Sequence, residues 1–256
     1  MKKLPDLWYA NLDAVLARIR STQEGPIREA AQRIVTAVTG GGLCHLYDTG
    51  HMLMYELIGR AGGILIFTPI FVELALKHPA RYRPPDEQAG SAAAKRPRVH
   101  MDEVEGMASY VLSQADCRPG DVLVLGSVAG VSRLAVDLAL EARAMGLYVI
   151  ALTSRAASSA VASRHPSGKR LYEVADLVLD QQTPPGDAIV PLPDAEPPIC
   201  PASGIAAAYL MWALTAQIVE DLRARGLTPG VLMSNHLPGA SEHNRRARLR
   251  YQEVGY

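Results

Sequence analysis

The tripeptide Asp48-Thr49-Gly50 carries the catalytic carboxylate in aspartic proteases, and it stands here in the stretch HLYDTGHMLMYELIGRAGG at residues 45–63. A protease of that class needs two such turns, because two carboxylates share one proton, and the sequence has one. Residues 43–47 form a short bulky run typical of a buried strand, whereas apolar residues after the turn recur at helical spacing. We therefore predict a strand, a tight turn and a helix whose first amide groups favour an anion. The alternative is that Thr49 only caps the helix and Gly50 only relieves the turn.

A second turn of similar composition, GSVAGVSR at residues 126–133, follows the apolar run at 122–125. It is neither a GxGxxG fingerprint nor a GxxxxGK[ST] phosphate loop, so no nicotinamide or ATP cofactor is expected. Two such turns at the ends of neighbouring parallel strands could hold one phosphate or one polyol between them. We predict one pocket formed by residues 49–51 and 127–132 at the carboxyl ends of those strands.

The elements that must position these turns follow from the hydrophobic periodicity. Two helices are predicted at the N-terminus, and strands and helices alternate after them. Such alternation implies a parallel sheet with helices on both faces. The whole chain, 1–256, is predicted to be one α/β domain, with N-terminal helices in 1–40, the α/β core in 41–200 and C-terminal helices in 201–256. Helices are expected over 5–22, 25–39, 51–60, 101–115, 132–145 and 203–225, and strands over 43–47, 64–70, 122–125, 148–152 and 175–180.

Two long segments carry no regular pattern. Residues 77–98 are rich in Pro, Arg, Ala and Gly, and a segment of that length is either a lid, a binding loop or a surface loop. Residues 183–201 are rich in proline and lead into the long apolar helix at 203–225. Because that helix has little polar face, we expect another layer or another chain to cover it, and a homo-oligomer is predicted.

Composition limits the partners. Lysine plus arginine equal aspartate plus glutamate at 26 each, so no overall field recruits nucleic acid or an acidic membrane, and a small molecule is the expected ligand. The three cysteines, at 44, 117 and 200, form neither a disulfide framework nor a CxxC site, and a cytoplasmic location is expected. Polar residues interrupt the N-terminal apolar run, which predicts an amphipathic helix and not a signal peptide.

Several motifs together resemble the SIS-domain sugar isomerases, in particular the uncharacterised phosphoheptose-isomerase-like branch. They are GHMLMYELIGRAGG, RPGDVLVLGSVAG, SRHPSGKRLYEVADLVLD at 163–180, GDA and the C-terminal EHN. The resemblance runs from about residue 15 to residue 250. It implies a doubly wound, mostly parallel sheet of five strands, a homo-dimer or tetramer, and phosphosugar sites near subunit interfaces. The residues themselves predict a helical N-terminal extension, and no cofactor is expected.

The two turns depart from the pattern of that family. Asp48, Thr49 and Met52 replace Gly, Ser and Ser in the first turn, and 127–132 read SVAGVS where the family has Ser-Asn-Ser-Gly-Arg-Asn. Hydroxyl donors remain at Thr49, Ser127 and Ser132. The substrate is therefore expected to be a phosphosugar, a related sugar derivative or an unphosphorylated sugar. Asp48 either caps its turn or hydrogen-bonds a sugar hydroxyl.

Aldose–ketose isomerisation needs a base and a second group that handles the hydroxyl proton. The resemblance places the base at Glu105, with Asp102 and Glu103 as alternatives on the same predicted helix; a solvated acid is the other interpretation of Glu105. His51 or His243 is the predicted partner. Glu56, about one turn beyond His51, either orients that imidazole or forms a surface salt bridge.

The predicted substrate-binding residues come from both turns and from the segment after the strand at 148–152. Lys169 binds an anion there or shares with Arg170 a salt bridge to Glu173. No metal is predicted, because the remaining histidines lack ligand spacing. The alternatives to a sugar isomerase are a non-catalytic sugar-binding module and an etherase or lyase of the muramic acid type. The predicted substrate-binding residues are Asp48, Thr49, Gly50, Glu56, Ser127, Gly130, Ser132 and Lys169.

Overall fold

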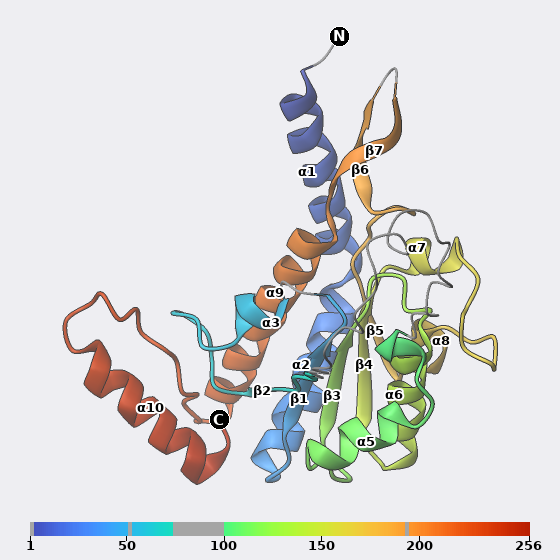
Figure 1. Cartoon of the computed structure of the whole chain (residues 1–256). Coiled ribbons are helices and arrows are strands. Elements are labelled where there is room, and N and C mark those ends of the chain that lie inside the picture. The colour runs from blue at the N-terminus through green and yellow to red at the C-terminus, as the bar shows by residue number, and fades with distance from the viewer. Residues whose placement is uncertain (1–2, 51–52, 74–99, 193–194) are drawn as a thin grey trace, which may run out of the picture.

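The N-terminal region forms two consecutive helices, as predicted. The computed structural model describes residues 3–50, 53–73, 100–192 and 195–256 (Figure 1). Helix α1 spans Leu4–Thr22 and helix α2 spans Glu24–Thr39. The buried residues of α2 recur at intervals of three and four, which places them on one face of the helix. That face packs on the core, and the remaining face is polar. The buried residues are Ala30, Ala31, Ile34, Val35 and Val38.

A parallel five-stranded sheet forms the centre of the fold. Its strands are β1 (Cys44–Asp48), β2 (Phe67–Pro69), β3 (Val122–Gly126), β4 (Tyr148–Thr153) and β5 (Leu177–Asp180), in the order β2-β1-β3-β4-β5. The chain runs from β1 outward to β2 and then returns to the other side of β1 to form β3 and β4. The connections therefore diverge at the β1–β3 pair, and ligands bind at such switch points, beyond the carboxyl ends of the strands. The sheet confirms the predicted fold class.

Helices cover both faces of the sheet because successive side chains of a buried strand point to opposite sides. Val122 and Val124 of β3 belong to the core beneath α2 and α9 (Ser203–Ala224). Leu123 and Leu125 belong to the opposite core, beneath α5 (Met107–Gln114), α6 (Arg133–Ala144) and α8 (Leu171–Val174). Two short helices, α3 (Leu53–Leu57) and α7 (Arg155–Ser159), complete this part of the fold.

The helix predicted over 101–115 is confirmed in its second part and is wrong in its first part. The structure has a single 3₁₀ turn, η1 (Met101–Glu103), and the helix α5 begins only at Met107. Gly106 separates the two with φ = +77°, a left-handed conformation that no α-helix continues through. Glu105 consequently lies in a turn and not on a helix face. The segment at 77–98, for which a lid or loop was predicted, lies outside the described residues.

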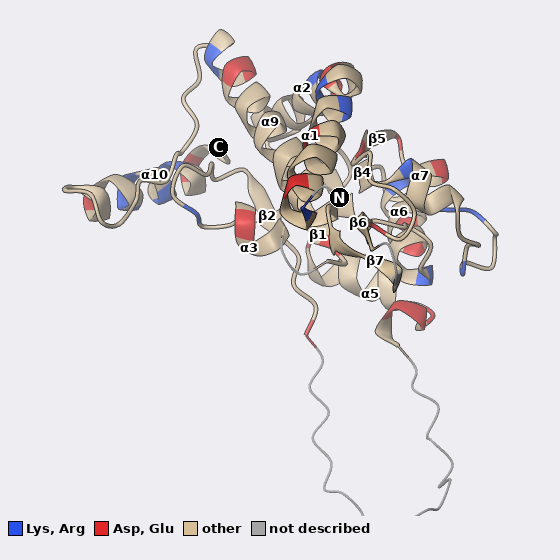
Figure 2. Cartoon of the chain, turned by 90° about the horizontal axis from the view of Figure 1, so that it is seen from above, with Lys and Arg blue, Asp and Glu red and all other residues tan. Residues whose placement is uncertain are grey.

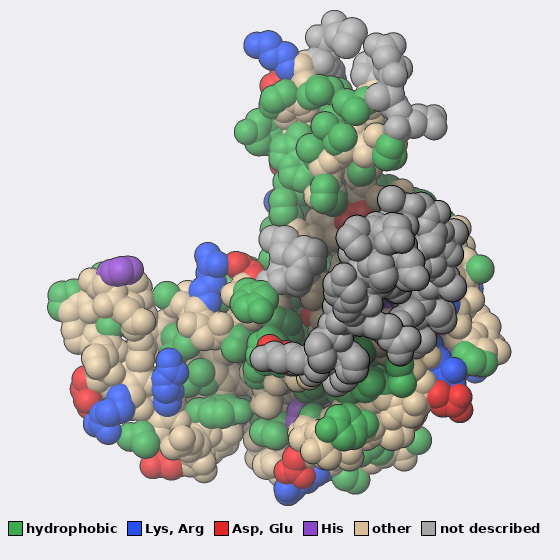
Figure 3. Space-filling view, in the orientation of Figure 1, with side chains coloured by type: hydrophobic (Ala, Val, Ile, Leu, Met, Phe, Trp, Pro, Cys, Tyr) green, Lys and Arg blue, Asp and Glu red, His purple; other side chains and the backbone are tan. Residues whose placement is uncertain are grey.

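The proline-rich segment forms a β-hairpin, which the sequence did not predict. Strand β6 (Ala188–Leu192) pairs antiparallel with β7 (Ala195–Pro201). Asn11 of α1 donates a hydrogen bond to the carbonyl of Ile189 at 2.6 Å, and Figure 1 shows α1 and the hairpin projecting together from the body. Figure 3 shows many hydrophobic side chains on this arm. Leu4 and Tyr9 of α1 and Ile199 of β7 are exposed.

Helix α9 is covered by its own chain. By length and composition it could cross a membrane, a test that the core helix of a globular protein also passes. Leu210 is fully buried and Trp212 packs on the same core, so the apolar surface of α9 does not by itself require a second copy. The homo-oligomer predicted from this helix stays a prediction. Helix α10 (Ala240–Val254) lies at one side of the molecule and carries several arginines (Figure 2).

Candidate functional site

The two predicted turns lie side by side. In the sheet register Asp48 is opposite Gly126, so β1 and β3 end at the same level. The backbone amide of Thr49 donates to the carbonyl of Gly126 at 2.9 Å, and its hydroxyl donates to the same oxygen at 3.2 Å. The amide of Ser127 donates to the carbonyl of Leu152 at 3.0 Å. The turns are therefore fixed to the sheet at its switch point.

A cavity of about 360 Å³ lies beside these turns, between them and the N-terminus of α6. It brings together four of the predicted substrate-binding residues, Thr49, Ser127, Gly130 and Ser132, and also Asp102, which the sequence offered as an alternative base. Tyr47 of β1 and Arg164 line it as well. We call it the switch-point cavity. Its lining residues are Tyr47, Thr49, Met101, Asp102, Ser127, Ala129, Gly130, Val131, Ser132, Leu134 and Arg164.

The wall of the switch-point cavity depends on a glycine and on a helix cap. Gly130 has φ = +58°, and a Cβ there would lie 2.8 Å from the Cβ of Leu171, so no larger residue fits without a shift. Ser132 is the N-cap of α6, and its hydroxyl accepts a hydrogen bond from the amide of Ala135 at 3.4 Å. The positive end of the α6 dipole therefore borders the cavity and favours an anionic or strongly polar group.

Charged groups enter the switch-point cavity from η1 and from the loop after α7. Arg164 forms ion pairs with Asp102 at 2.8 Å and with Glu103 at 2.9 Å, and its amide donates to the carbonyl of Val131 at 2.9 Å. Asp102 lines the cavity, and Glu103 does not. Burial first, and then the charges of Asp102 and Asp48, raise the pKa of Tyr47, so its phenol stays protonated and can donate a hydrogen bond.

Arg164 and Tyr47 were not predicted from the sequence as site residues. Arg164 directly precedes His165 within SRHPSGKR, the segment from which Lys169 and Arg170 were selected instead. Lys169 is exposed and does not line the cavity, and its carbonyl accepts a hydrogen bond from the hydroxyl of Ser163 at 2.6 Å. The guanidinium of Arg170 donates to two backbone carbonyls of this loop, so it has a structural role in the loop.

Asp48 and Gly50 face a different cavity from Thr49. The carboxylate of Asp48 accepts a hydrogen bond from the amide of Gly50 at 3.1 Å, so Asp48 caps its turn. Both residues line a second, mostly apolar cavity of about 510 Å³ on the other side of the turns, beside Val128 and the N-terminus of α9 at Ser203. The residues predicted as one pocket are thus divided between two neighbouring cavities.

The predicted catalytic residues are not gathered at the switch-point cavity. The side chain of Glu105 is 85% exposed, pairs with Arg133 at 3.2 Å and does not line that cavity. His243 lies on α10, with Nε2 at 2.9 Å from the carbonyl oxygen of Val231, and Figure 1 shows α10 far from α6. His51 lies outside the described residues.

Glu56 links α3 to α9. Its carboxylate accepts a hydrogen bond from the indole of Trp212 at 3.1 Å and forms an ion pair with Arg60. It lines none of the cavities described above. Among the residues that the structure describes, no group of three or more His, Cys, Asp or Glu side chains could hold a metal ion.

Comparison with known proteins gives the family of the chain. A family model described as "SIS domain" matches residues 7–154. The UPF0309 protein of Geobacillus kaustophilus is 31% identical over 248 residues, which cover 96% of this chain and 93% of that protein. The UPF0309 protein of Streptomyces coelicolor is 35% identical over 245 residues, which cover 93% and 91%. A phosphoheptose isomerase from Francisella tularensis has 16% identity over 85% of this chain and 98% of its own, with a TM-score of 0.48, a similarity too remote to assign a reaction.

The doubly wound sheet and the family match define an SIS-domain protein. Within that class, the chain belongs to the UPF0309 family, whose members match it over nearly their whole length.

Proposed function

We propose that this protein binds a phosphosugar or a related anionic sugar derivative in the switch-point cavity and isomerises it between aldose and ketose forms. The observation that carries the proposal is the meeting of Thr49, Ser127 and the α6 N-terminus at the switch point of the sheet. Hydroxyls and a helix N-terminus suit an anionic group, and polar side chains suit a polyol. Arg164 supplies the cation.

The proposed proton-transfer groups are Asp102 and Tyr47. Of the three carboxylates considered from the sequence, Asp102, Glu103 and Glu105, only Asp102 lines the cavity. A carboxylate can remove the carbon-bound proton, and a protonated phenol can donate to the oxygen that becomes the enediol hydroxyl. Both groups line one cavity, which is the first requirement for such a pair.

Ligand binding is tested by thermal unfolding in the presence of pentose, hexose and heptose phosphates, the same sugars without phosphate, and sugar acids. A ligand that binds the native state raises the melting temperature. Arg164→Gln should weaken binding by about tenfold or more, because a hydrogen-bonded charge is lost. The matched control is Lys169→Gln, which removes a cation of the same loop outside the cavity and should bind as the wild type does. Equal loss in both variants would argue for a diffuse charge effect instead of this site.

Catalysis is tested with the ligand so identified, in deuterium oxide. An enediol route exchanges the carbon-bound hydrogen with solvent, which NMR detects. Asp102→Asn should lower turnover by roughly two to four orders of magnitude with little change in binding, and Glu105→Gln should not. The opposite result would move the base to Glu105. Binding without exchange by the wild type would support the non-catalytic sugar-binding module.

A further inference from the structure

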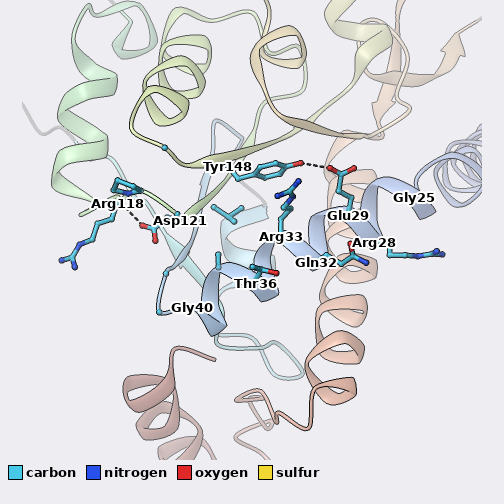
Figure 4. Close-up of a pocket in the computed structure, with 17 residues that line it drawn as sticks. Gly25, Arg28, Glu29, Gln32, Arg33, Thr36, Gly40, Arg118, Asp121 and Tyr148 are labelled. Atoms are coloured by element: carbon cyan, nitrogen blue, oxygen red, sulfur yellow. Dashed lines mark hydrogen bonds between the residues drawn. The ribbon is translucent and has the colours of Figure 1, made fainter.

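A third cavity lies at the opposite edge of the sheet, where the strands begin. Its volume is about 1020 Å³, and it is bounded by the polar face of α2, by the turns that precede β1 and β3, and by the start of β4 (Figure 4). Val122 and Tyr148, the first residues of β3 and β4, line it. The switch-point cavity lies at the other ends of these strands, and the two cavities share no lining residue. We call this one the α2 cavity.

Glycines keep the walls of the α2 cavity open. Gly41, Gly120 and Gly146 line it and have φ values of +87°, +93° and +89°. Side chains are disfavoured at such positions, so the turns present mainly backbone to the cavity. Most of the polar side chains come from α2, where residues 28, 32 and 36 follow one another at intervals of four along one face.

Arg33 is held over the cavity by an aromatic ring. Its guanidinium carbon lies 4.8 Å from the ring centroid of Tyr148, and the hydroxyl of Tyr148 donates to Glu29 at 2.9 Å. Figure 4 shows Arg33 reaching toward Tyr148, while Arg28 and Arg118 extend outward at opposite ends. A stacked guanidinium is oriented in advance, and its remaining N–H groups suit two oxygens of one anion.

The carboxylates nearby leave Arg33 available for a ligand. Glu29 is engaged by the Tyr148 hydroxyl, and no ion pair joins Arg33 to a carboxylate among the described residues. Asp121 also lines the cavity but is 3% exposed. Its oxygens accept hydrogen bonds from the amides of Leu43 and Arg118 and from His45. The carboxylate oxygens of Asp121 are therefore occupied by donors of the protein and not by Arg33.

We propose that the α2 cavity is a second binding site, for a phosphorylated small molecule of about nucleotide size, with its phosphate on Arg33. The volume is far larger than one inorganic phosphate needs and is in the range of sites for organic ligands. Gln32 and Thr36, on the same face of α2, offer an amide and a hydroxyl to the rest of the molecule. This site does not depend on the function proposed above, because it uses none of the same residues.

The test is calorimetric titration with three probes, AMP, ribose 5-phosphate and inorganic phosphate, on the full-length protein. AMP should bind, and phosphate should bind at least tenfold more weakly. Ribose 5-phosphate should also bind, and because the switch-point cavity is proposed to bind phosphosugars, only the part of its affinity that Arg33→Gln removes is assigned to the α2 cavity. Arg33→Gln should weaken AMP binding by about tenfold to a hundredfold, since a charge-assisted hydrogen-bond pair is lost. Arg33→Lys keeps the charge but loses the planar geometry, and its binding should fall between the two.

Controls separate this site from the switch-point cavity and from a protein contact. Ser127→Ala alters only the switch-point cavity, so it should leave AMP binding at the wild-type value. Circular dichroism checks that Arg33→Gln folds, which its exposed position on α2 favours. Equal AMP affinity in Arg33→Gln and wild type would overturn the proposal, as would no binding by any of the three probes. A change in sedimentation of Arg33→Gln without a change in AMP binding would assign this face to a second copy of the chain.

Discussion

The two ends of the parallel sheet carry different arrangements of polar groups. At the carboxyl ends of β1 and β3, the backbone is bonded to the sheet and hydroxyls line a small cavity beside a helix N-terminus. At the amino ends, a buried carboxylate, Asp121, ties the start of β1 to the segment before β3 through hydrogen bonds with Leu43 and His45, and a third bond, from the amide of Arg118, lies within its own segment. The first arrangement leaves polar groups open to the proposed sugar site, and the second fixes the strands beneath the α2 cavity.

The polar groups at the two ends differ in exposure, and exposure decides whether a polar group mainly affects stability or can also bind a ligand. Asp121 and His45 are 3% and 0% exposed, so their pairing replaces water almost entirely. Thr49 is exposed and Ser127 is partly exposed, so their polar groups can exchange water for a ligand. Substitutions in the buried Asp121–His45 pair should therefore affect stability most, and those in the turns at the carboxyl ends should affect both stability and ligand binding.

The largest expected effect is that of Asp121→Ala. It leaves His45 and the amides of Leu43 and Arg118 without their acceptor in a buried place, which should cost about 3–5 kcal/mol of unfolding free energy. Urea denaturation measures the change. The control is Asp116→Asn, which removes the exposed charge that pairs with Arg118, keeps a residue type that tolerates φ = +51°, and should change stability little. Equal, small effects in both variants would show that Asp121 does not clamp the two segments.

The next effect is expected at Gly130, in the wall of the switch-point cavity. Gly130→Ala meets both a left-handed backbone and the Cβ of Leu171 at 2.8 Å, and should cost about 2–4 kcal/mol. Gly168→Ala has the same backbone problem at φ = +70° but no atom within 4 Å, so it should cost about 1 kcal/mol. The difference between the two variants, from urea denaturation, isolates the contact. A difference near zero would mean that Leu171 shifts to admit the new Cβ at no cost in unfolding free energy.

A smaller effect at Ser132 separates the helix cap from ligand binding. Ser132→Ala removes the cap of α6 and should cost about 1 kcal/mol. Ser132→Asp restores a capping oxygen but adds a negative charge beside the switch-point cavity. It should therefore keep the stability and weaken binding of an anionic sugar, measured by thermal shift. Unchanged binding in Ser132→Asp would remove the α6 N-terminus from the proposed site.

The sequence predicted most of the fold because its elements have strong patterns. The strands at 122–125 and 148–152 are continuous apolar runs. The turn at 126–133 is rich in glycine and serine, which marks the end of one strand and the start of the next helix. The helix predicted over 101–115 failed at Gly106, since no local pattern reveals that this glycine takes a left-handed conformation. The hairpin at 188–201 was missed because its prolines argue against a strand, although edge strands of a two-stranded ribbon tolerate them.

The site was predictable in part, for a physical reason. Thr49 and Ser127 follow adjacent strands, so the sequence placed them together correctly. Arg164 reaches the same cavity from a loop after β4, and no periodicity encodes where a loop side chain ends. The α2 cavity was not predicted at all, because Arg28 and Arg33 in the sequence resemble the solvated face of any amphipathic helix.

The smallest expected effect concerns the contribution of Tyr148, at the amino end of β4, to stability, and it appears only at high pH. Burial first, and then the neighbouring carboxylate of Glu29, raise the pKa of Tyr148 to about 12. The folded protein therefore keeps this proton between about pH 10 and pH 12, whereas the unfolded chain releases it. Stability contributed by this group is present below about pH 10 and is lost as the pH rises toward 12. Because Tyr148 is partly exposed, the loss should be small.

Absorbance titration of the phenolate measures this pKa directly, by difference between the wild type and Tyr148→Phe. Glu29→Gln keeps a hydrogen-bond acceptor but removes the negative charge, so the late-titrating phenol should shift to lower pH. Glu24→Gln is the matched control, because it lies on the same helix and pairs with Arg28 instead of Tyr148. If Glu29→Gln left the titration unchanged, the carboxylate of Glu29 would not be engaged by Tyr148 in solution. It would then be free to pair with Arg33, and the case for an anion on that arginine would weaken.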